Sequence, residues 1–258
     1  MKHNYMQMKY AVCILPLAHV RLLPNHRDEM TSQFLFGERG IIMEDNRDGW
    51  LLLQNSHDGY TGWCRSNQFL LSKFPFTEST EFTADWVNEI IVNDKIMMLP
   101  FASSLSLLNT KHQDLSVIYN GNIIDAANTV ANEININKIA RLFLNTTYLW
   151  GGKSIFGIDC SGYVQTVFKL MNIHLLRDAK LQVAQGSSVG FLQETVCGDL
   201  AFFDEGEEIM HVGILLNEHE IIHASGNVRI DKIDNEGIIH TDTGKRTHRL
   251  RIIKRILP

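Results

Sequence analysis

The sequence predicts a multidomain chain in which two small β-barrels precede a larger α+β domain. In residues 1–127, apolar runs of strand length alternate with turn signals such as N-R-D-G and H-D-G, as in small barrels. From residue 128 the apolar spacing follows a helical period, and from about residue 199 it returns to strand-like runs. Helices followed by a block of strands are typical of an α+β domain. We therefore predict domains at residues 1–72, 73–127 and 128–258.

The composition limits the classes of partner. Of the 258 residues, 45% are hydrophobic and 21% are charged, as in ordinary globular proteins. The formal net charge of −5 argues against a nucleic-acid partner, which would require a basic surface. No apolar run is long enough to cross a bilayer, so we expect no membrane insertion. We also expect no cofactor and no metal ion.

The cysteines and the N-terminal apolar stretch bear on the cellular compartment. No C-x-x-C pair occurs, which favours free thiols in a reducing compartment; the cysteines are Cys13, Cys64, Cys160 and Cys197. Residues 11–20 imitate the core of a short signal peptide, but Pro16 interrupts them and Arg21 follows without a small-x-small cleavage pattern. We interpret this stretch as the first strand and expect a cytoplasmic protein, with a periplasmic or secreted location as the alternative.

Five short strands are expected in the first domain, at residues 12–15, 34–36, 41–43, 50–53 and 62–64. Between them lie an arginine-leucine-proline loop, a Q-F-L-F-G-E element ending at Glu38, and the elements D-G-W and G-Y-T-G-W. This arrangement resembles a bacterial SH3-like domain. We expect Trp50 and Trp63 in the barrel core. Tyr60 follows D-G on a turn, where an aromatic side chain is less often buried.

The second domain repeats this pattern less clearly. Residues 89–98 are interpreted as one strand, residues 100–104 as a turn, and residues 115–119 as a strand that ends in the tight turn Asn120-Gly121. We predict a second, divergent SH3-like barrel, and a domain boundary near residue 127 where the helical period begins.

Residues 148–162, Y-L-W-G-G-K-S-I-F-G-I-D-C-S-G, place Cys160 at the expected start of a helix. Asp159 and Ser161 are residue types that cap helix N-termini. The apolar residues that follow share one helical face: Val164, Val167, Phe168 and Met171. A thiol in the first turn lies at the positive end of the helix dipole, which favours the thiolate and a lowered pKa.

Two histidines are predicted to share one face of a hairpin. Strand-like runs occur at residues 199–203, 211–216, 220–224, 229–233 and 250–256, and only three residues join the second run to the third. If Leu216 pairs with Glu220, Gly213 lies opposite His223, and His211 is a diagonal neighbour of His223 at roughly 7–8 Å. A register slip of one residue would separate the two histidines. A cysteine at a helix start with two such histidines supplies a nucleophile, a base and a group to orient the base.

Several ordered motifs resemble the NlpC/P60 cysteine peptidases. They are D-C-S-G at 159–162, H-V-G-I at 211–214, I-H-A-S around His223, the upstream Y-x-W-G-G and the run G-D-L-A-F-F at 198–203. The resemblance covers about residues 128–258 and implies a papain-like fold. With SH3-like domains in front, the whole chain is similar to the γ-D-glutamyl-L-diamino acid endopeptidases, or dipeptidyl-peptidases VI.

The resemblance implies a role for each matching residue. Cys160 corresponds to the nucleophile, His211 to the general base, His223 to the orienting residue, and Tyr148 to a tyrosine whose hydroxyl lies near the reacting carbonyl.

Four further residues are implied to hold the substrate: Ser161, Asp178 of an R-D-A/S-x-x-Q motif, Tyr60, and Glu38. A groove that is closed at one end needs carboxylates to meet the free ammonium group of the substrate, which suits Asp178 and Glu38. From the residues alone, Asp178 beside Arg177 would be interpreted as a solvated surface charge.

The implied function is hydrolysis of the γ-D-Glu–diamino acid bond in murein tri- and tetrapeptides during cell-wall recycling. Amidases and acyltransferases share the fold, so an open-groove endopeptidase or amidase remains an alternative. A non-catalytic cell-wall-binding protein is a second alternative, although it would have no use for the cysteine and both histidines. A zinc site built from those three residues lacks a fourth ligand.

Overall fold

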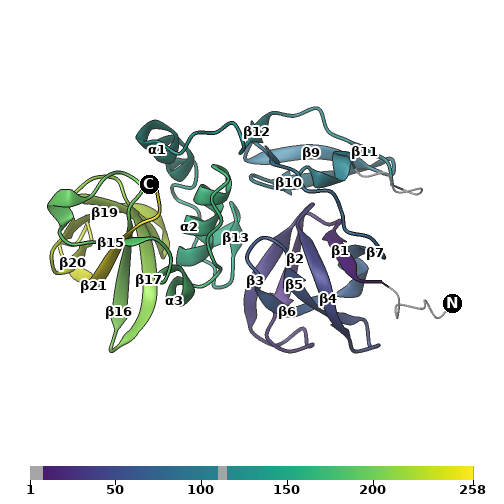
Figure 1. Cartoon of the computed structure of the whole chain (residues 1–258), viewed down its shortest axis with the longest axis horizontal. Coiled ribbons are helices and arrows are strands. Elements are labelled where there is room, and N and C mark those ends of the chain that lie inside the picture. Colours follow the sequence, from purple (N-terminus) through teal and green to yellow (C-terminus); the bar gives the residue numbers. More distant parts are fainter. Residues whose placement is uncertain (1–7, 110–114, 258) are drawn as a thin grey trace. The chain divides into compact units, whose positions relative to one another are not determined.

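The computed structural model describes residues 8–109 and 115–257 (Figure 1). The chain divides into two compact units. One comprises Met1–Ala127 together with Trp150–Ile155, and the other comprises Asn128–Leu149 with Phe156–Pro258. The short segment Trp150–Ile155, which precedes the Cys160 helix in sequence, therefore packs as part of the first unit.

An antiparallel sheet of seven strands forms most of the first unit, in the order β3-β2-β6-β5-β4-β1-β7. The strands are β1 Tyr10–Cys13, β2 Leu17–Arg21, β3 Met30–Leu35, β4 Arg39–Asp45, β5 Trp50–Asn55, β6 Thr61–Arg65 and β7 Phe69–Ser72. The five expected strands are confirmed, with shifted ends. The apolar stretch at 11–20 is two strands and not one, because the chain bends at Pro16 between β1 and β2.

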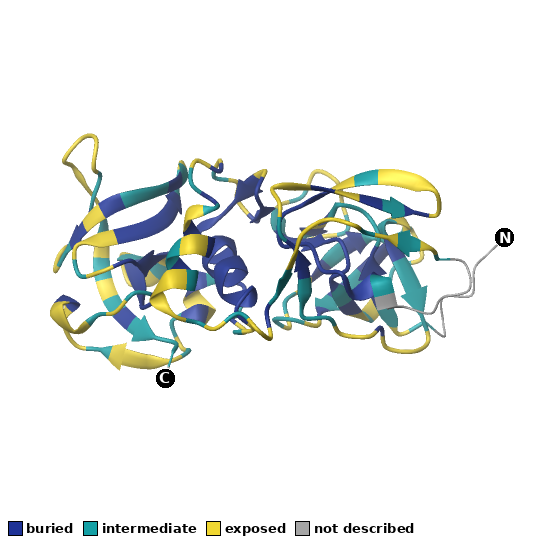
Figure 2. Cartoon of the chain, turned by 90° about the horizontal axis from the view of Figure 1, so that it is seen from above, coloured by how far each residue is buried: buried dark blue, intermediate teal, exposed yellow. Residues whose placement is uncertain are grey.

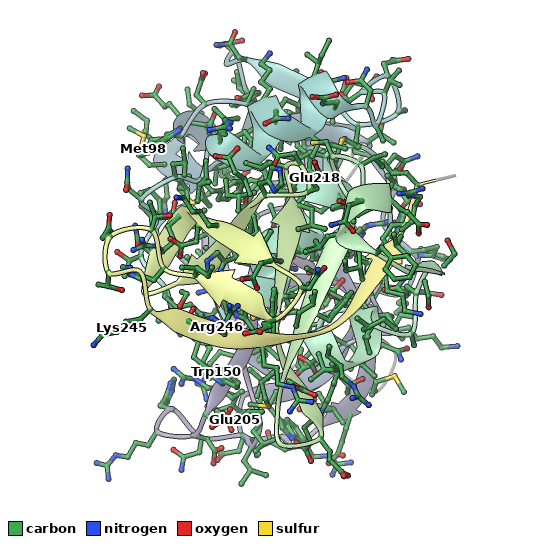
Figure 3. The ribbon with its side chains drawn as sticks, turned by 90° about the vertical axis from the view of Figure 1, so that its left-hand side faces the viewer. Met98, Trp150, Glu205, Glu218, Lys245 and Arg246 are labelled. Carbon is green, nitrogen blue, oxygen red and sulfur yellow. The ribbon has the colours of Figure 1, made fainter. Side chains whose placement is uncertain are left out.

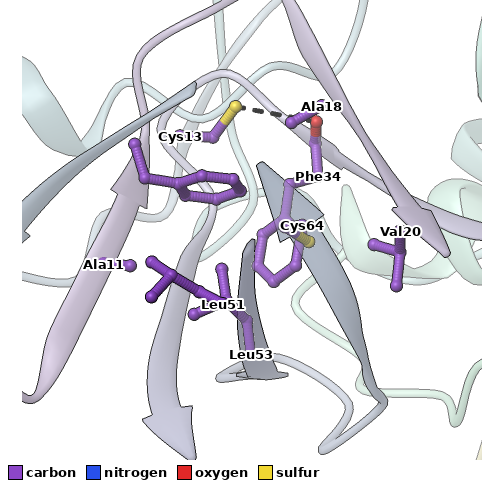
Figure 4. Packing of buried hydrophobic residues seen from close by; sticks show 9 residues of the cluster. Ala11, Cys13, Ala18, Val20, Phe34, Leu51, Leu53 and Cys64 are labelled. Atoms are coloured by element: carbon purple, nitrogen blue, oxygen red, sulfur yellow. Dashed lines mark hydrogen bonds between the residues drawn. The ribbon is translucent and has the colours of Figure 1, made fainter. Parts of the chain in front are cut away.

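The sheet curls around an apolar cluster that includes Cys13, Phe34 and Cys64 (Figure 4). Phe34 of edge strand β3 and Phe69 of edge strand β7 meet edge to face with ring centroids 5.3 Å apart, so the two edges of the sheet approach each other. Trp50 is buried as expected. Trp63 is only half-buried, and the prediction of a core position for it is wrong. Successive strand residues face opposite sides, and Cys64 occupies the side facing the core.

Residues 73–127 form two small sheets, β10-β9-β11 and β12-β8. Their strands are β8 Glu81–Thr83, β9 Val87–Val92, β10 Lys95–Pro100, β11 Val117–Ile118 and β12 Ile123–Asp125. The single strand expected at 89–98 is a hairpin, because Asn93 and Asp94 adopt left-handed φ values of 48° and 61° and reverse the chain. Ile90 and Leu99 of this hairpin share a core cluster with Val12 of β1. That residues 73–127 form a second SH3-like barrel, separate from the first, stays a prediction.

The second unit begins with helices and continues as a sheet. The helices are α1 Glu133–Arg141, α2 Cys160–Lys169 and α3 Ala179–Gln182. The seven strands are β15 Ser187–Val189, β16 Leu200–Glu205, β17 Glu208–Leu215, β18 Glu220–Ser225, β19 Asn227–Asp234, β20 Gly237–Ile239 and β21 Arg246–Arg255. They follow the order β15-β21-β16-β17-β18-β19-β20, and β20 also pairs with β21. This pairing closes the sheet on itself, and Figure 3 labels Arg246 where β21 begins.

Helix α2 is buried along its whole length (Figure 2). The four apolar residues expected on one face are buried, and so are the polar residues Gln165, Thr166 and Lys169. The helix contacts β17 and β18, so the chain positions the first turn of α2 against the strands that carry the two histidines. In the described parts of the chain, no helix is both long and apolar enough to span a membrane.

Candidate active site

Cys160 is the first residue of α2, as the sequence predicts. Asp159 is the N-cap, and its carboxylate accepts a hydrogen bond from the Gly162 backbone N–H at 2.7 Å. This bond satisfies one of the free N–H groups of the first turn and fixes the direction in which the helix starts. The position of the thiol is thereby tied to the backbone geometry of the cap.

A buried arginine holds the same turn from the side. Arg177, with 1% of its surface exposed, donates from both terminal nitrogens to the Asp159 carboxylate, and Nη1 also lies 3.0 Å from Ser161 Oγ. Gln182 Nε2 donates to the Ser161 carbonyl at 3.1 Å. The R-D-A-K-L-Q segment therefore braces the residues on both sides of Cys160.

The Cys160 thiol is buried, with 7% of the residue exposed. Its Sγ lies 4.0 Å from the carbonyl oxygen of Met210, the residue before His211. Burial, with a further contribution from the Asp159 carboxylate, raises the pKa of Cys160 to about 12. The expectation of a lowered pKa is therefore wrong for the resting protein: burial outweighs the helix N-terminus, and Cys160 is a neutral thiol near pH 7.

The histidine hairpin has the predicted register. Gly213 of β17 lies opposite His223 of β18, and the Leu216 N–H donates to the Glu220 carbonyl. Gly213 is required there, because a Cβ would come within 2.8 Å of the His223 Cβ and 2.7 Å of Ile221 Cδ1. Because Gly213 has no side chain, the neighbouring strand leaves room for the His223 side chain on this face of the sheet.

A buried hydrogen-bond chain starts at His211. His211 Nε2 lies 2.8 Å from His223 Nδ1, and His223 Nε2 lies 3.1 Å from Asp231 Oδ2. Burial lowers the pKa of His211 well below its ordinary value, and the charges of His223 and His248 lower it further. Burial also lowers the pKa of His223, against the opposing effect of Asp231. His211 is therefore neutral near pH 7, which is the form that accepts a proton.

Two rings enclose the His211 imidazole. His248 of β21 stacks on it with centroids 4.2 Å apart and 25° between the planes, and Phe203 of β16 lies 5.8 Å away. Burial, and then the charge of His223, lowers the pKa of His248 to about 4. The site therefore contains three neighbouring imidazoles, all neutral near pH 7.

Tyr148 and Asp178 lie in the same unit as Cys160. Tyr148 is half-buried, and burial raises the pKa of its hydroxyl, with the next contribution from the charge of Cys160. The Tyr148 backbone bridges to Ile158, two residues before Cys160, so Tyr148 lies beside the segment that leads into α2. Asp178 is half-buried directly before α3, and it follows Arg177, which contacts Asp159 and Ser161.

Tyr60 and Glu38 belong to the first unit. Tyr60 is half-buried and packs against the core cluster of the curled sheet. Glu38 is 7% exposed; its carboxylate accepts from Lys153 Nζ at 3.1 Å and from the Leu35 N–H at 3.1 Å. The partners of Glu38 thus differ from the substrate amine expected from the sequence, because a lysine ammonium already binds the carboxylate.

Four residues of these clusters have no role in the prediction from sequence: Asp231, His248, Arg177 and Lys153. Asp231 could have been found by extending the hairpin argument by one strand across the S-G-N turn at 225–227, which places Asp231 on the His223 face. Arg177 was noticed only as a neighbour of Asp178. His248 and Lys153 gave no sequence signal, since their contacts are set by distant parts of the chain.

The geometry defines a class of protein before any comparison. A thiol at a helix start, close to a strand that carries a neutral, hydrogen-bonded histidine, is the arrangement of a cysteine-type peptidase, with a nucleophile and a base to deprotonate it. The comparisons agree. Residues 145–247 match the NlpC/P60 family, and residues 20–69 match the bacterial dipeptidyl-peptidase Sh3 domain. The chain therefore carries an NlpC/P60 domain preceded by an SH3 domain, which confirms the resemblance.

Curated relatives cover most of the chain. A γ-D-glutamyl-L-lysine dipeptidyl-peptidase of Bacillus cereus is 26% identical over 88% of this chain and 78% of its own length. Dipeptidyl-peptidase 6 of Lysinibacillus sphaericus is 23% identical over 88% of this chain and 92% of its own. A solved NlpC/P60 family protein from Bacillus cereus superposes with a TM-score of 0.76 at 19% identity, and it covers 96% of this chain and 100% of its own. That structure supports the fold.

Proposed function

We propose that this chain hydrolyses the bond between the γ-carboxyl group of D-glutamate and an L-diamino acid in peptidoglycan stem peptides, releasing L-Ala-γ-D-Glu. The observation that carries the proposal is the placement of Cys160 next to the strand that bears His211, with His223 hydrogen-bonded behind that base. The relatives named γ-D-glutamyl-L-lysine dipeptidyl-peptidases support the choice of bond.

The proposed reaction uses the chain's own groups and balances its protons. The Cys160 Sγ attacks the γ-carbonyl carbon of D-glutamate as its proton passes to His211. The C–N bond then breaks, and the diamino acid leaves as an amine that takes this proton. Water attacks the resulting thioester and gives a proton to His211. His211 passes this proton to the Cys160 sulfur as the C–S bond breaks. The proposed role of the Tyr148 hydroxyl is to donate a hydrogen bond to the carbonyl oxygen as negative charge develops there.

Recognition of a free N-terminal amine is proposed to depend on Asp178. Asp178 is half-buried and directly follows Arg177 in the sequence. Arg177 contacts Asp159 and Ser161, the neighbours of Cys160. Ser161 is proposed to contact the substrate, and the role expected for Tyr60 stays a prediction. We propose that Asp178, and not Glu38, binds the substrate amine, since the Glu38 carboxylate already pairs with Lys153.

A preference for a free L-alanine amine fits a role in recycling. In intact wall peptide this amine is blocked by its link to the glycan, so only released fragments present it. We propose that the substrates are such released tri- and tetrapeptides and that the protein acts in the cytoplasm. Residues 73–127 are proposed to act with the SH3 domain as a second, divergent SH3-like element.

The test compares L-Ala-γ-D-Glu-L-Lys with its N-acetylated form, with products identified by mass spectrometry. The wild type should prefer the free amine by about ten- to a hundred-fold in kcat/KM, the value of one charge-assisted contact. Asp178→Ala should lose most of this preference, and Glu38→Gln should keep it. Equal cleavage of both peptides would instead indicate an open-groove endopeptidase, and no cleavage of either would indicate a binding protein. Diaminopimelate in place of lysine tests which diamino acid is preferred.

A further inference from the structure

We infer that Asp231 is a positioning residue that determines, through His223, which ring nitrogen of His211 is the base. The inference rests on the proposed function and concerns the part of the site that lies behind the base. The placement follows from strand pairing. Arg229 of β19 lies opposite His223 of β18, and Asp231 lies opposite Ile221, so Asp231 is a diagonal neighbour of His223 on the same face.

Asp231 is an ionised acceptor with no protons to donate. It is buried, with 2% of its surface exposed. Arg229 donates to its two oxygens at 2.8 and 2.9 Å, and the Thr241 N–H donates to Oδ1 at 2.8 Å. Burial raises the pKa of this carboxyl, but the hydrogen bonds from His223, Arg229 and Thr241 outweigh it and hold the pKa well below its ordinary range.

An ionised carboxylate can only accept, and this fixes both imidazoles in turn. His223 Nε2, at 3.1 Å from Asp231 Oδ2, must carry a proton. Since His223 is neutral, its Nδ1 then has a lone pair, and His211 Nε2, at 2.8 Å, must be the donor to it. The neutral His211 is left with one basic nitrogen, Nδ1.

This arrangement has a consequence for catalysis. When His211 accepts the thiol proton at Nδ1, its Nε2–H already points at a lone pair, so the imidazolium forms without reorientation of any ring. The carboxylate at the end of the chain stabilises the developing charge and stays ionised. If His223 carried its proton on Nδ1, that proton would face His211 Nε2 and would force the His211 proton onto Nδ1, where it blocks the base.

The first test reads the protons directly and needs no substrate. In the uniformly ¹⁵N-labelled full-length wild type at pH 7.5, the ring-nitrogen shifts should show the Nε2–H tautomer for both His211 and His223. An Nδ1–H tautomer at His223 would overturn the inference. Because no peptide is cleaved in this measurement, its outcome is independent of whether the proposed substrate is correct.

The second test uses variants of matched chemistry. Asp231→Asn can donate its amide to His223 Nε2 and favour the wrong tautomer, so kcat should fall by roughly 10²–10⁴-fold with little change in KM. Alkylation of Cys160 by iodoacetamide should slow in the same variant. Asp234→Asn is the control, because Asp234 lies on the same strand and also pairs with an arginine, Arg246, but stands outside the site. It should keep the wild-type kcat.

A double variant separates positioning from a structural role. If Asp231 acts through His223, Asp231→Asn should cost no further kcat in a His223→Ala background, once the melting temperature shows that the enzyme is folded. Two results would contradict the inference. One is a wild-type kcat in folded Asp231→Asn, and the other is that Asp231→Asn lowers kcat by the same factor whether His223 is present or replaced by alanine. Should Asp231→Asn fail to fold, the wild-type tautomer measurement still decides.

Discussion

Each unit contains a buried cysteine, Cys13 in the first and Cys160 in the second. Their thiols have similar pKa values but different surroundings. In the first unit, Cys13 is fully buried and its Sγ donates to the Leu15 carbonyl at 3.3 Å; burial raises its pKa to about 12. In the second unit, burial raises the pKa of Cys160 to about 12 as well. Cys13 lies among apolar side chains such as Phe34 and Leu53, whereas Cys160 begins a helix beside the His211 strand.

Thiol acidity does not distinguish Cys160, the proposed nucleophile, from Cys13, because burial raises the pKa of both to about 12. A buried neutral thiol becomes reactive only if a base accepts its proton as the sulfur attacks. In the proposed mechanism His211 serves Cys160 in this way, whereas the Cys13 Sγ donates to the Leu15 backbone carbonyl at 3.3 Å, and a carbonyl oxygen is not a base that can take its proton. The following predictions test whether the base, and not the acidity, separates the two thiols.

Removal of the thiol should have the largest effect. Cys160→Ala should lower kcat by about 10⁶-fold, because the covalent route is lost, and should leave the fold intact. Cys13→Ala should keep kcat and lower the free energy of unfolding by about 1 kcal/mol through loss of buried contacts. Turnover of the stem peptide and thermal denaturation measure the two quantities. A fully active Cys160→Ala would disprove the assignment of the nucleophile.

Removal of the base should cost nearly as much. His211→Ala should lower kcat by on the order of 10⁴-fold or more, because nucleophile and base act as one unit. It should also reduce iodoacetamide labelling of Cys160 to the slow rate of Cys13, as read by peptide mass spectrometry. His223→Ala should cost less, since water can partly replace an orienting group. Small and equal losses in both variants would mean that the histidines are core residues.

The sequence contained enough to predict the histidine hairpin and the start of the Cys160 helix, because the geometry of each is set by residues close in sequence. The three-residue connection between β17 and β18 sets the register that brings His211 and His223 together, and Asp159 marks the start of the Cys160 helix. The turn at Asn93-Asp94 was missed, because neither residue is glycine although both adopt positive φ.

Other contacts that the sequence did not predict join segments far apart in the chain. Lys153 and Glu38 are separated by 115 residues, and nothing near either residue signals the pairing. Arg177 appears in a charged R-D pair typical of a surface, yet it is buried against Asp159. The prediction of a lowered pKa for Cys160 was wrong for the same reason. A helix start can be recognised from three residues, but burial of the thiol depends on the packing of the whole unit.

Two buried ion pairs, one in each unit, allow a comparison in which effects of intermediate size are expected. Arg177→Met in the second unit and Lys153→Met in the first each leave a buried carboxylate without its cationic partner. Each should lower the free energy of unfolding by about 3–5 kcal/mol. Only Arg177→Met should also lower kcat of the folded enzyme, because Arg177 braces Asp159 and Ser161 on either side of Cys160. Denaturant titration and turnover at low temperature separate these effects, and equal kcat values would mean that the brace has no catalytic consequence.

The smallest effect is expected from the ring stacked on the base. His248→Phe keeps an aromatic ring against His211 but removes a group whose positive charge disfavours a second charge there. The rings of His223 and Phe203, which also contact His211, are unchanged. His248, with a pKa of about 4, is charged only in acid. Its removal should therefore move the acidic limb of the kcat/KM profile toward higher pH and leave kcat/KM unchanged between pH 6 and pH 8. His219→Phe, at a side chain that is 79% exposed, is the matched control and should leave the pH profile unchanged. A profile that shifts toward lower pH in His248→Phe would show that His248 does not repel the charge on His211.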